Sequence, residues 1–141
     1  MPLKQLSLFV ENKPGQLTHP CRVLAEAGIN IVTLCLADTQ QFGILRLIVR
    51  EWQRAAQLLE GAGCVVNVSD VLAVEVADRP GGMAALLAAL DDAAVNIEYT
   101  YAFTCARAGA ALLIVRVEDV AGAQRILQQR GFSLVDELTP P

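Results

Sequence analysis

The chain has 141 residues, of which 54% are hydrophobic and 18% charged, so its composition is that of a folded globular protein and excludes disorder. Its formal net charge is −4 and it has no basic stripe, which argues against binding to nucleic acid or to an anionic membrane surface. The N-terminus lacks the long apolar run of a signal peptide, and no apolar segment approaches the roughly 20 residues that cross a bilayer. We therefore expect a cytoplasmic protein.

The thiol and imidazole side chains form no reactive or metal-binding pattern in the sequence. Cys21, Cys35, Cys64 and Cys105 contain no Cys-x-x-Cys pair, and His19 is the single histidine. Because a zinc site needs clustered ligands, we predict reduced, mostly buried thiols and no metal or other cofactor. His19 and Cys21 lie two residues apart in a predicted helix, so their side chains point in different directions, and no third group orients them. The sequence therefore predicts no catalytic residue and no enzyme.

The chain repeats itself at a constant offset of 66 residues. The segment Val10-Glu-Asn-Lys-Pro-Gly-Gln-Leu17 corresponds to Val76-Ala-Asp-Arg-Pro-Gly-Gly-Met83. The same offset relates Asn30 to Asn96, and it holds over about forty residues, which indicates two copies of one structural unit. No Gly/Ser/Pro-rich linker separates the copies, so we expect them to pack together.

The hydropathy pattern predicts the same order of elements in each copy: a strand, the Pro-Gly turn, a helix, two strands, a short helix and a final strand. The first strand and helix of each copy are marked by the alternation of Leu6, Leu8 and Val10 or Leu72, Val74 and Val76, and by the helical spacing that starts at Leu17 or Met83. The later elements are predicted near 30–37, 43–50, 52–61 and 64–69 in the first copy, and near 96–103, 110–117, 119–130 and 132–138 in the second. Gly28 is placed to adopt a left-handed conformation past the first helix, which its counterpart Ala94 tolerates less well.

The order strand-helix-strand-strand-helix-strand is that of a ferredoxin-like unit. We predict an α+β fold with two such domains, residues 1–70 and 71–141, forming one continuous eight-stranded antiparallel sheet with the helices on one face. A single unit of this size has a thin core, and joining the two sheets edge to edge removes exposed strand edges.

The first candidate site is the Pro-Gly turn between the first strand and the first helix of each copy. Glycine lets a ligand approach the backbone closely, and the free N–H groups of a helix start attract anions such as a carboxylate. Asn12 or Asp78 either caps the helix or turns outward to hold an ammonium group. Asx-x-Pro-Gly is also a good turn-and-cap sequence, so a purely structural role stays open.

Two further segments follow the first helix of each copy, Leu24-Ala-Glu-Ala-Gly-Ile-Asn-Ile31 and Leu90-Asp-Asp-Ala-Ala-Val-Asn-Ile97. With the turns, they make nearly the whole chain resemble a pair of ACT domains with no catalytic domain attached. Residues 36–38, 42–46 and 98–103 extend the likeness to stand-alone tandem ACT proteins of bacteria. ACT domains are regulatory modules that bind amino acids at domain interfaces, so the resemblance implies an amino-acid sensor.

The resemblance also implies a ligand site. In the serine-inhibited type of phosphoglycerate dehydrogenase, the effector is held by the turn Asn, the residue two before it and the Asn of a Val-Asn-Ile segment. The corresponding residues here are Asn12, Val10 and Asn30. That enzyme has a His where Val10 stands, so serine is not carried over to this chain. In the second copy, Asp78 replaces the turn Asn and breaks the equivalence of the two sites.

Tyr99, Tyr101 and Phe103 alternate along a predicted strand and therefore share one of its faces. They either form an aromatic wall of the ligand site or fill the interface between the repeats. A base-stacking platform is a rival interpretation, which the acidic net charge and the lack of nearby Lys or Arg argue against.

These observations together predict a non-catalytic regulatory protein that binds a free amino acid between its ACT repeats and forms a homodimer. The ligand carboxylate would meet the turn amides, and its ammonium would meet Asn side chains and backbone carbonyls. The alternative is a ligand-free regulatory subunit that docks on an amino-acid biosynthetic enzyme. The predicted ligand-binding residues are Val10, Asn12, Lys13, Pro14, Gly15, Gln16, Leu17, Asn30, Asp78, Gly81, Gly82, Met83, Asn96, Tyr99 and Tyr101.

Overall fold

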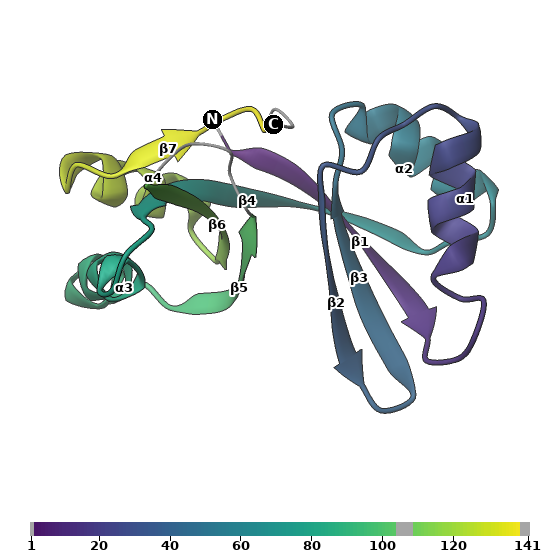
Figure 1. The fold of residues 1–141 in the computed structure, drawn as a ribbon, viewed down its shortest axis with the longest axis horizontal. Coiled ribbons are helices and arrows are strands. Elements are labelled where there is room, and N and C mark those ends of the chain that lie inside the picture. Colours follow the sequence, from purple (N-terminus) through teal and green to yellow (C-terminus); the bar gives the residue numbers. More distant parts are fainter. Residues whose placement is uncertain (1, 104–108, 139–141) are drawn as a thin grey trace. The chain divides into compact units, whose positions relative to one another are not determined.

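A computed structural model describes residues 2–103 and 109–138 (Figure 1). The chain divides into two compact units, a first unit of Lys4–Ser69 and a second unit of Asp70–Pro141 with Met1–Leu3. The elements are β1 (Leu3–Glu11), α1 (Thr18–Glu26), β2 (Thr33–Thr39), β3 (Phe42–Ile48), α2 (Trp52–Gly61), β4 (Val66–Ala77), α3 (Gly82–Asp92), β5 (Ile97–Phe103), β6 (Ala110–Val117), α4 (Val120–Gln129) and β7 (Ser133–Val135). None of the helices in the described ranges is both long and apolar enough to cross a membrane.

Each unit contains four strands in ferredoxin-like order, and strand β4 contributes to both. The order is β2-β3-β1-β4 in the first unit and β5-β6-β4-β7 in the second. Residues 66–69 of β4 belong to the first unit and residues 70–77 to the second. The paired strands β1/β3, β2/β3, β4/β6, β4/β7 and β5/β6 are all antiparallel. The predicted α+β class and the predicted order of elements are confirmed.

The expected continuous eight-stranded sheet is wrong in its strand number, because the described strands form a seven-stranded sheet. The last strand of the first copy and the first strand of the second run on without a turn as the twelve residues of β4. Between Val66 and Ala77 the sequence has no Gly or Pro, so nothing in it ends the strand where the copies meet.

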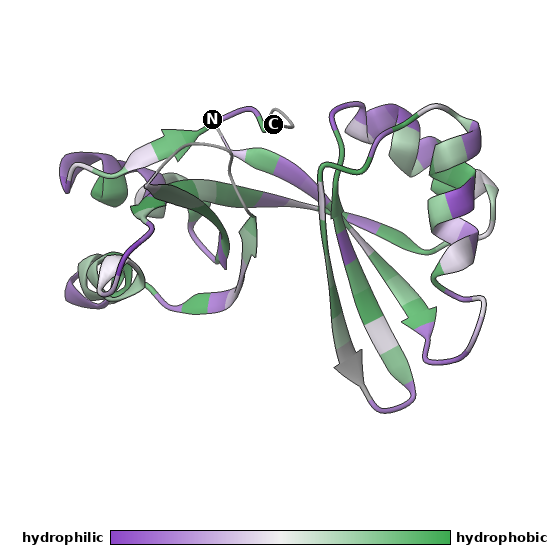
Figure 2. Ribbon diagram, viewed as in Figure 1, coloured by the Kyte–Doolittle hydropathy of each residue, from purple (hydrophilic) through white to green (hydrophobic). Residues whose placement is uncertain are grey.

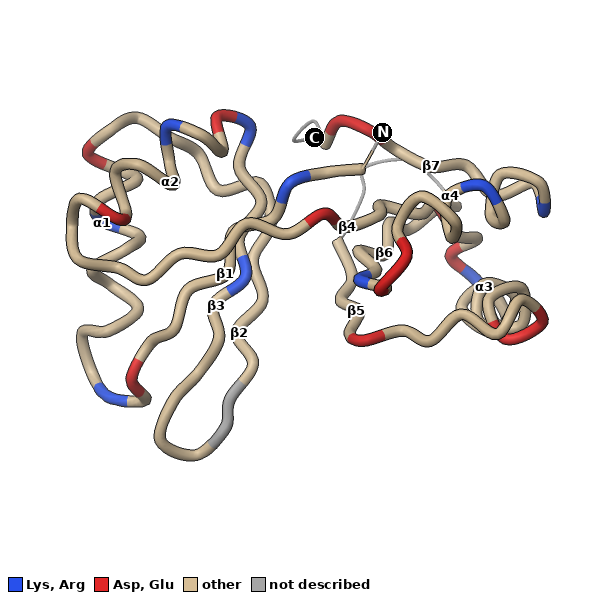
Figure 3. The backbone as a smooth tube through the Cα atoms, turned by 180° about the vertical axis from the view of Figure 1, so that it is seen from behind, with Lys and Arg blue, Asp and Glu red and all other residues tan. Residues whose placement is uncertain are grey.

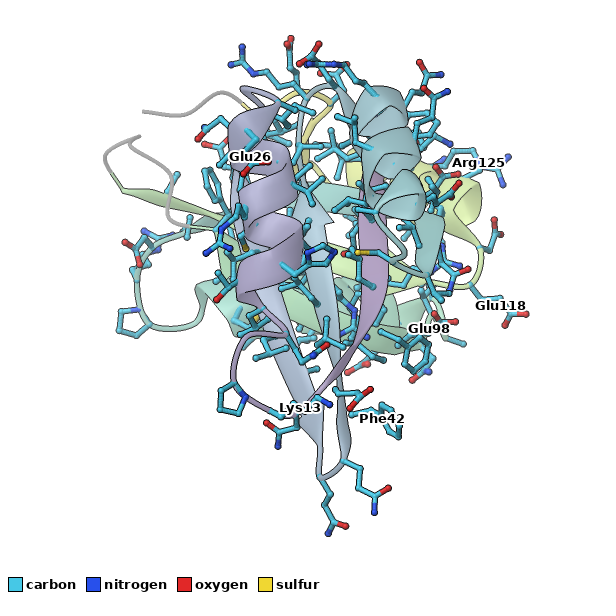
Figure 4. The ribbon with its side chains drawn as sticks, turned by 90° about the vertical axis from the view of Figure 1, so that its right-hand side faces the viewer. Lys13, Glu26, Phe42, Glu98, Glu118 and Arg125 are labelled. Carbon is cyan, nitrogen blue, oxygen red and sulfur yellow. The ribbon has the colours of Figure 1, made fainter. Side chains whose placement is uncertain are left out.

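In the first unit, alternate strand residues and the inner faces of two helices form one core. Leu6 and Leu8 of β1 and Leu47 of β3 are fully buried, as are Leu24 of α1 and Leu59 of α2. Both helices therefore cover the same face of the strands, and Figure 4 shows α1 and α2 side by side in front of them. The residues that face this core recur at every second position in the strands and at helical spacing in the helices, as the sequence pattern predicts.

The second unit repeats this arrangement with its own core. Val74 of β4 and Val115 and Val117 of β6 are fully buried against Leu86 of α3 and Leu127 of α4. Figure 2 shows hydrophobic residues along the strands, while hydrophilic residues gather in the loop after β1 and at the β2–β3 hairpin. Each unit thus has an apolar interior of its own, and its loops carry the polar groups.

Several boundaries differ from the predicted ones. Strand β2 begins at Thr33 and not at residue 30, and β7 covers only 133–135 of the predicted 132–138. Gly28 has φ 72°, as predicted, and Ala94 adopts the same left-handed region with φ 56°. Since a Cβ atom disfavours this region, Ala94 holds local backbone strain that its glycine counterpart avoids.

Candidate functional site

The Pro-Gly turn has nearly the same backbone geometry in the two copies. Gly15 and Gly81 have φ 89° and 91°, a left-handed conformation that glycine adopts without steric cost. The amide of Gln16 donates to the carbonyl of Lys13 at 3.4 Å, and the equivalent Gly82 amide donates to Arg79 at 3.0 Å. The sequence repeat is therefore also a repeat of turn structure.

The helix start that follows each turn has open backbone amides. Within the described residues, no hydrogen bond is made by the amides of Leu17 and Thr18 in the first copy or of Met83 and Ala84 in the second. Neither helix has a side-chain N-cap bond. These amides and the helix dipole make both turns favourable places for an anionic group.

In the first copy, the turn is closed by its own side chains. The Asn12 side-chain amide donates to the Gln40 carbonyl at 2.9 Å, and the Asn12 backbone amide donates to the Gln41 carbonyl at 3.0 Å. The Lys13 ammonium pairs with the Glu11 carboxylate at 2.9 Å. The turn is thus tied to the two-residue tip of the β2–β3 hairpin, and its one cation is neutralised. Figure 4 shows Lys13 beside Phe42, at this end of the unit.

The second copy lacks both of these side-chain interactions. Asp78 replaces Asn12, and an ionised carboxylate cannot donate the hydrogen bond that Asn12 makes. Ala77 replaces Glu11, so Arg79 has no ion-pair partner among the described residues. The backbone bond is kept, because the Asp78 amide donates to the Gly109 carbonyl at 2.9 Å. The second turn therefore presents an unneutralised cation.

A pocket of about 350 Å³, here named the turn pocket, opens at this second turn. Its walls are the end of β4, the turn with the start of α3, and the loop that joins α4 to β7. Among the described residues that line it, Glu75 and Arg79 are the charged ones and Phe132 is the aromatic one. The lining residues are Glu75, Val76, Ala77, Arg79, Pro80, Gly81, Gly82, Ala85, Gly131, Phe132 and Ser133.

Gly82 keeps the wall of the turn pocket close to β4. A Cβ atom at this position would collide with the carbonyl oxygen of Ala77. The start of α3 therefore approaches the strand more closely than any residue with a side chain would allow. The equivalent position in the first copy is Gln16, so this close approach belongs to the second copy only.

The structure does not bring the predicted asparagines to the turn of their own copy. Helix α1 lies between the Asn12 turn and Asn30, and its nine residues span about 13 Å. In the second unit, Asn96 lines a different pocket of about 380 Å³, which shares no residue with the turn pocket. Both asparagines are exposed.

That second pocket, here named the acidic pocket, lies at the other end of α3, and its charged residues are all acids: Glu98, Glu118 and Asp119. Glu98 and Glu118 lie near each other in Figure 4. The Asp119 carboxylate accepts the Gly122 amide at 3.0 Å as the N-cap of α4, and Glu98 pairs with Arg116 at 3.4 Å. Two of the three carboxylates thus have structural partners.

The tyrosines also lie outside the turn pocket. The strand register pairs Tyr99 with Arg116 and Tyr101 with Ile114, and Phe103 shares their face, as predicted. An irregularity between Ile97 and Tyr99 shifts the register, so the aromatic face is opposite to the one on which Ile97 packs against the helix core. The aromatic side chains are half-buried on the face of the sheet away from α3 and α4.

Among the thiols, burial raises the pKa of Cys64, which packs against the first core. The imidazole of His19 makes a 3.0 Å hydrogen bond with the carbonyl of Ala62, the C-cap of α2, and so joins the start of α1 to the end of α2. In the described ranges, no three His, Cys, Asp or Glu side chains cluster as a metal site requires. Cys105 lies outside the described residues.

Sequence reasoning missed Glu75, Phe132 and the hairpin residues Gln40 and Gln41. The signal that could have found the difference between the turns is the repeat itself, since Glu11 aligns with Ala77 and Lys13 with Arg79. Lys13 has an acidic neighbour, Glu11, with which it forms an ion pair, and Arg79 has Ala77 at the equivalent position. A comparison of the copies for lost partners would have directed attention to Arg79.

The chain is similar to known proteins in sequence and in fold. The family model of the ACT domain pair matches residues 1–139, so the chain belongs to the ACT domain pair family. A protein of Bacteroides thetaiotaomicron has a crystal structure that is 36% identical in sequence, with a TM-score of 0.89 over 96% of this chain and 92% of that one. ACT domains are regulatory, amino-acid-binding modules.

More distant structures share the fold. The regulatory subunits of aspartate kinase from Thermus thermophilus and Thermus flavus are 20% and 19% identical, with TM-scores of 0.66 and 0.64. The match covers 91% of this chain and of the first subunit, and 92% of this chain and of the second. No curated protein sequence matches the chain.

Proposed function

We propose that this protein is a non-catalytic regulator that binds a free amino acid at the Pro-Gly turn of its second copy. The observation that carries the proposal is the turn pocket, which places Arg79, a cation without an ion-pair partner among the described residues, beside a helix start with open amides. The carboxylate of a free amino acid matches this concentration of positive charge. Pockets of this size are typical of small-molecule sites.

The carboxylate of the ligand binds Arg79 and the start of α3. Arg79 has no competing ion pair among the described residues, and a guanidinium can hold a carboxylate through two hydrogen bonds. The amides of Met83 and Ala84 lie at the same helix start, which favours negative charge.

The ammonium of the ligand binds backbone carbonyls of the pocket wall. Glu75 is a residue of that wall, but it pairs with Leu112 in the sheet, so its side chain lies on the face away from α3. Phe132, on the α4–β7 loop, offers apolar surface to the side chain of the ligand. The resemblance places such ligands between ACT repeats, so Asn30 or Asn96 would reach the ligand from a repeat other than the one whose turn holds it.

The regulated target is an amino-acid biosynthetic enzyme in the cytoplasm, and the active form is a homodimer. Two structures that share the fold are regulatory subunits of aspartate kinase, which supports a partner of this class. Ligand binding would then shift the equilibrium of this association.

A thermal-shift panel of the twenty amino acids at millimolar concentration tests the proposal. A ligand at 100 times its Kd stabilises the folded state by about 2.7 kcal/mol, which raises the melting temperature by several degrees. We expect one or a few amino acids to stabilise the wild type and to lose this effect in Arg79→Gln. Lys13→Gln is the matched control, because Lys13 holds the same position in the first copy. A panel without any stabiliser would contradict ligand binding and favour the ligand-free docking subunit.

A further inference from the structure

In the first copy, a planar ring joins the first helix to the loop that follows the second helix. The ring is the imidazole of His19 near the start of α1, and its Nε2 atom lies 3.0 Å from the carbonyl oxygen of Ala62. Because a carbonyl only accepts, Nε2 is the donor of this hydrogen bond. Ala62 is the first residue of the loop between α2 and β4, so the imidazole spans the distance between α1 and that loop.

The backbone hydrogen bonds identify the residue that takes the place of His19 in the second copy. The His19 amide donates to the Gly15 carbonyl at 3.3 Å, and the Ala85 amide donates to the Gly81 carbonyl at 2.9 Å. Gly15 and Gly81 are the equivalent glycines of the two turns, with φ 89° and 91°. Ala85 therefore holds in α3 the position that His19 holds in α1.

The loop after the second helix also has the same backbone structure in the two copies. Gly63 and Gly131 have φ 91° and 84°, and each is followed by an amide that donates at 2.9 Å to a helix carbonyl five residues earlier. These two amides belong to Cys64 and Phe132. Phe132 therefore stands where the first copy has Cys64, and it adds a half-buried aromatic side chain to the loop.

The exchange of His19 for Ala85 opens space in the second copy. A methyl group replaces the imidazole, and Ala85 and the loop residues Gly131 and Phe132 line the turn pocket. The position that the ring holds in the first copy, between the helix and the loop, is thus part of the turn pocket in the second.

This part of the turn pocket has little charge to offer the side chain of a ligand. Between Arg79 and Asp91 the sequence has no charged residue, and Figure 3 shows most of α3 without one. Glu75 pairs with Leu112 in the sheet, so its side chain lies on the face away from α3. The remaining charged residue of the described lining is Arg79, which the ligand carboxylate occupies. A charged side chain would lose water here without gaining a partner.

We propose that the amino acid bound at the turn pocket has a planar aromatic ring, and that this ring lies between Ala85 and Phe132. The ring takes the place that the His19 imidazole holds in the first copy, where the protein supplies such a ring itself. Contact with Phe132 adds the attraction between aromatic rings to the burial of apolar surface. This inference rests on the proposed function and names the class of its ligand.

Isothermal titration calorimetry with L-phenylalanine, L-tyrosine, L-tryptophan and L-histidine tests the class of ligand, with L-leucine, L-aspartate and L-lysine for comparison. We expect the tightest ligand to be one of the four ring-bearing amino acids, with a Kd at least about tenfold lower than those of the other three, because only a ring fills the space and contacts Phe132 over its face.

Ala85→His tests the position of the ring, because it installs the side chain of the first copy. We expect the Kd of the ring-bearing ligand to rise about tenfold or more, since the new imidazole takes the space of the ligand ring. Ala88→His is the matched control, because Ala88 is exposed on α3 outside the pocket lining, and it should keep the wild-type Kd. Phe132→Leu should raise the Kd about threefold or more by removing the aromatic contact. Far-UV circular dichroism must show wild-type structure in all three variants.

The outcomes separate this inference from the proposed function. Absence of binding by all twenty amino acids would overturn both. A tightest ligand without a ring, weakened by Arg79→Gln, would overturn the ring and leave the turn site in place. A ring-bearing ligand that Arg79→Gln weakens and Ala85→His does not would overturn the position of the ring between Ala85 and Phe132.

Discussion

The side-chain amide of Asn12 donates a 2.9 Å hydrogen bond to the carbonyl of Gln40, which has φ 49° at the tip of the β2–β3 hairpin. Gln40 and Gln41 form a two-residue hairpin loop, where Asn-Gly is the favoured pair and glutamine is strained. Asn12 therefore stabilises a hairpin whose own sequence does not favour its turn.

Removal of the Asn12 amide should loosen this hairpin. We expect Asn12→Ala to lower the free energy of unfolding by about 1 kcal/mol, because one exposed hydrogen bond is lost. Gln40→Gly should raise it by up to about 1 kcal/mol by relieving the positive φ. Urea denaturation measures both, and Asp78→Ala is the control for Asn12, with little change expected. An Asp78→Ala loss equal to that of Asn12→Ala would contradict the difference between the turns.

Gly28 after α1 and Ala94 after α3 both have a positive φ, so exchanging glycine and alanine at these positions should change the stability in opposite directions. Ala94→Gly should stabilise the protein by about 1 kcal/mol, since glycine adopts φ 56° without strain. Gly28→Ala should destabilise it by about the same amount at φ 72°. Thermal denaturation of both variants measures the changes, and nothing within 4 Å of Gly28 would add a steric effect. A loss of stability in Ala94→Gly would contradict the strain argument.

Much of the fold could be predicted from the repeat, because the strand alternation and the helical spacing of apolar residues are clear in both copies. The joining of two strands into β4 was harder to predict. The turns before the helices are marked by Gly and Pro, whereas a strand that continues from one copy into the next is marked only by the absence of these residues. The register shift before Tyr99 has no sequence signal either. It depends on packing against β6, and it sets the face on which the tyrosines lie.

Of the candidate site, the sequence predicted the turns and their glycines but not the pocket. The pocket brings together Glu75, Arg79 and Phe132. Their proximity depends on where β7 ends and on how the α4–β7 loop returns to β4. The separation of Asn30 from the Asn12 turn is set by the length of α1 and was open to deduction.

The close approach of α3 to β4 can be tested at Gly82. Gly82→Ala should move the helix start, because its Cβ would collide with the Ala77 carbonyl, and should cost about 1 to 3 kcal/mol of stability. Gly61→Ala is the matched control, since its Cβ meets nothing within 4 Å at a helical position, and it should stabilise by about 1 kcal/mol. Chemical denaturation separates the two. An unchanged Gly82→Ala protein would show that the helix start adjusts freely.

The raised pKa of Cys64 predicts slow alkylation and a pH-dependent stability. The folded state keeps the thiol proton to higher pH than the unfolded chain does, so the stabilisation is complete below the unfolded pKa and is lost as pH rises through the folded one. As the pH rises above the ordinary pKa of an unfolded thiol, about 8.5, the wild type should lose more stability than Cys64→Ala. Iodoacetamide labelling followed by peptide mass spectrometry should show faster modification of Cys64 in urea than in buffer. Equal rates would contradict burial of the thiol.

The central claim is that the second turn, and not the first, binds an amino acid. Isothermal titration calorimetry of the stabilising amino acid into wild type, Arg79→Gln and Lys13→Gln tests it most directly. We expect Arg79→Gln to weaken binding by about tenfold or more, because a charged hydrogen bond to the carboxylate is lost, while Lys13→Gln keeps the wild-type Kd. Weakened binding in Lys13→Gln with unchanged binding in Arg79→Gln would contradict the claim and place the ligand at the first turn.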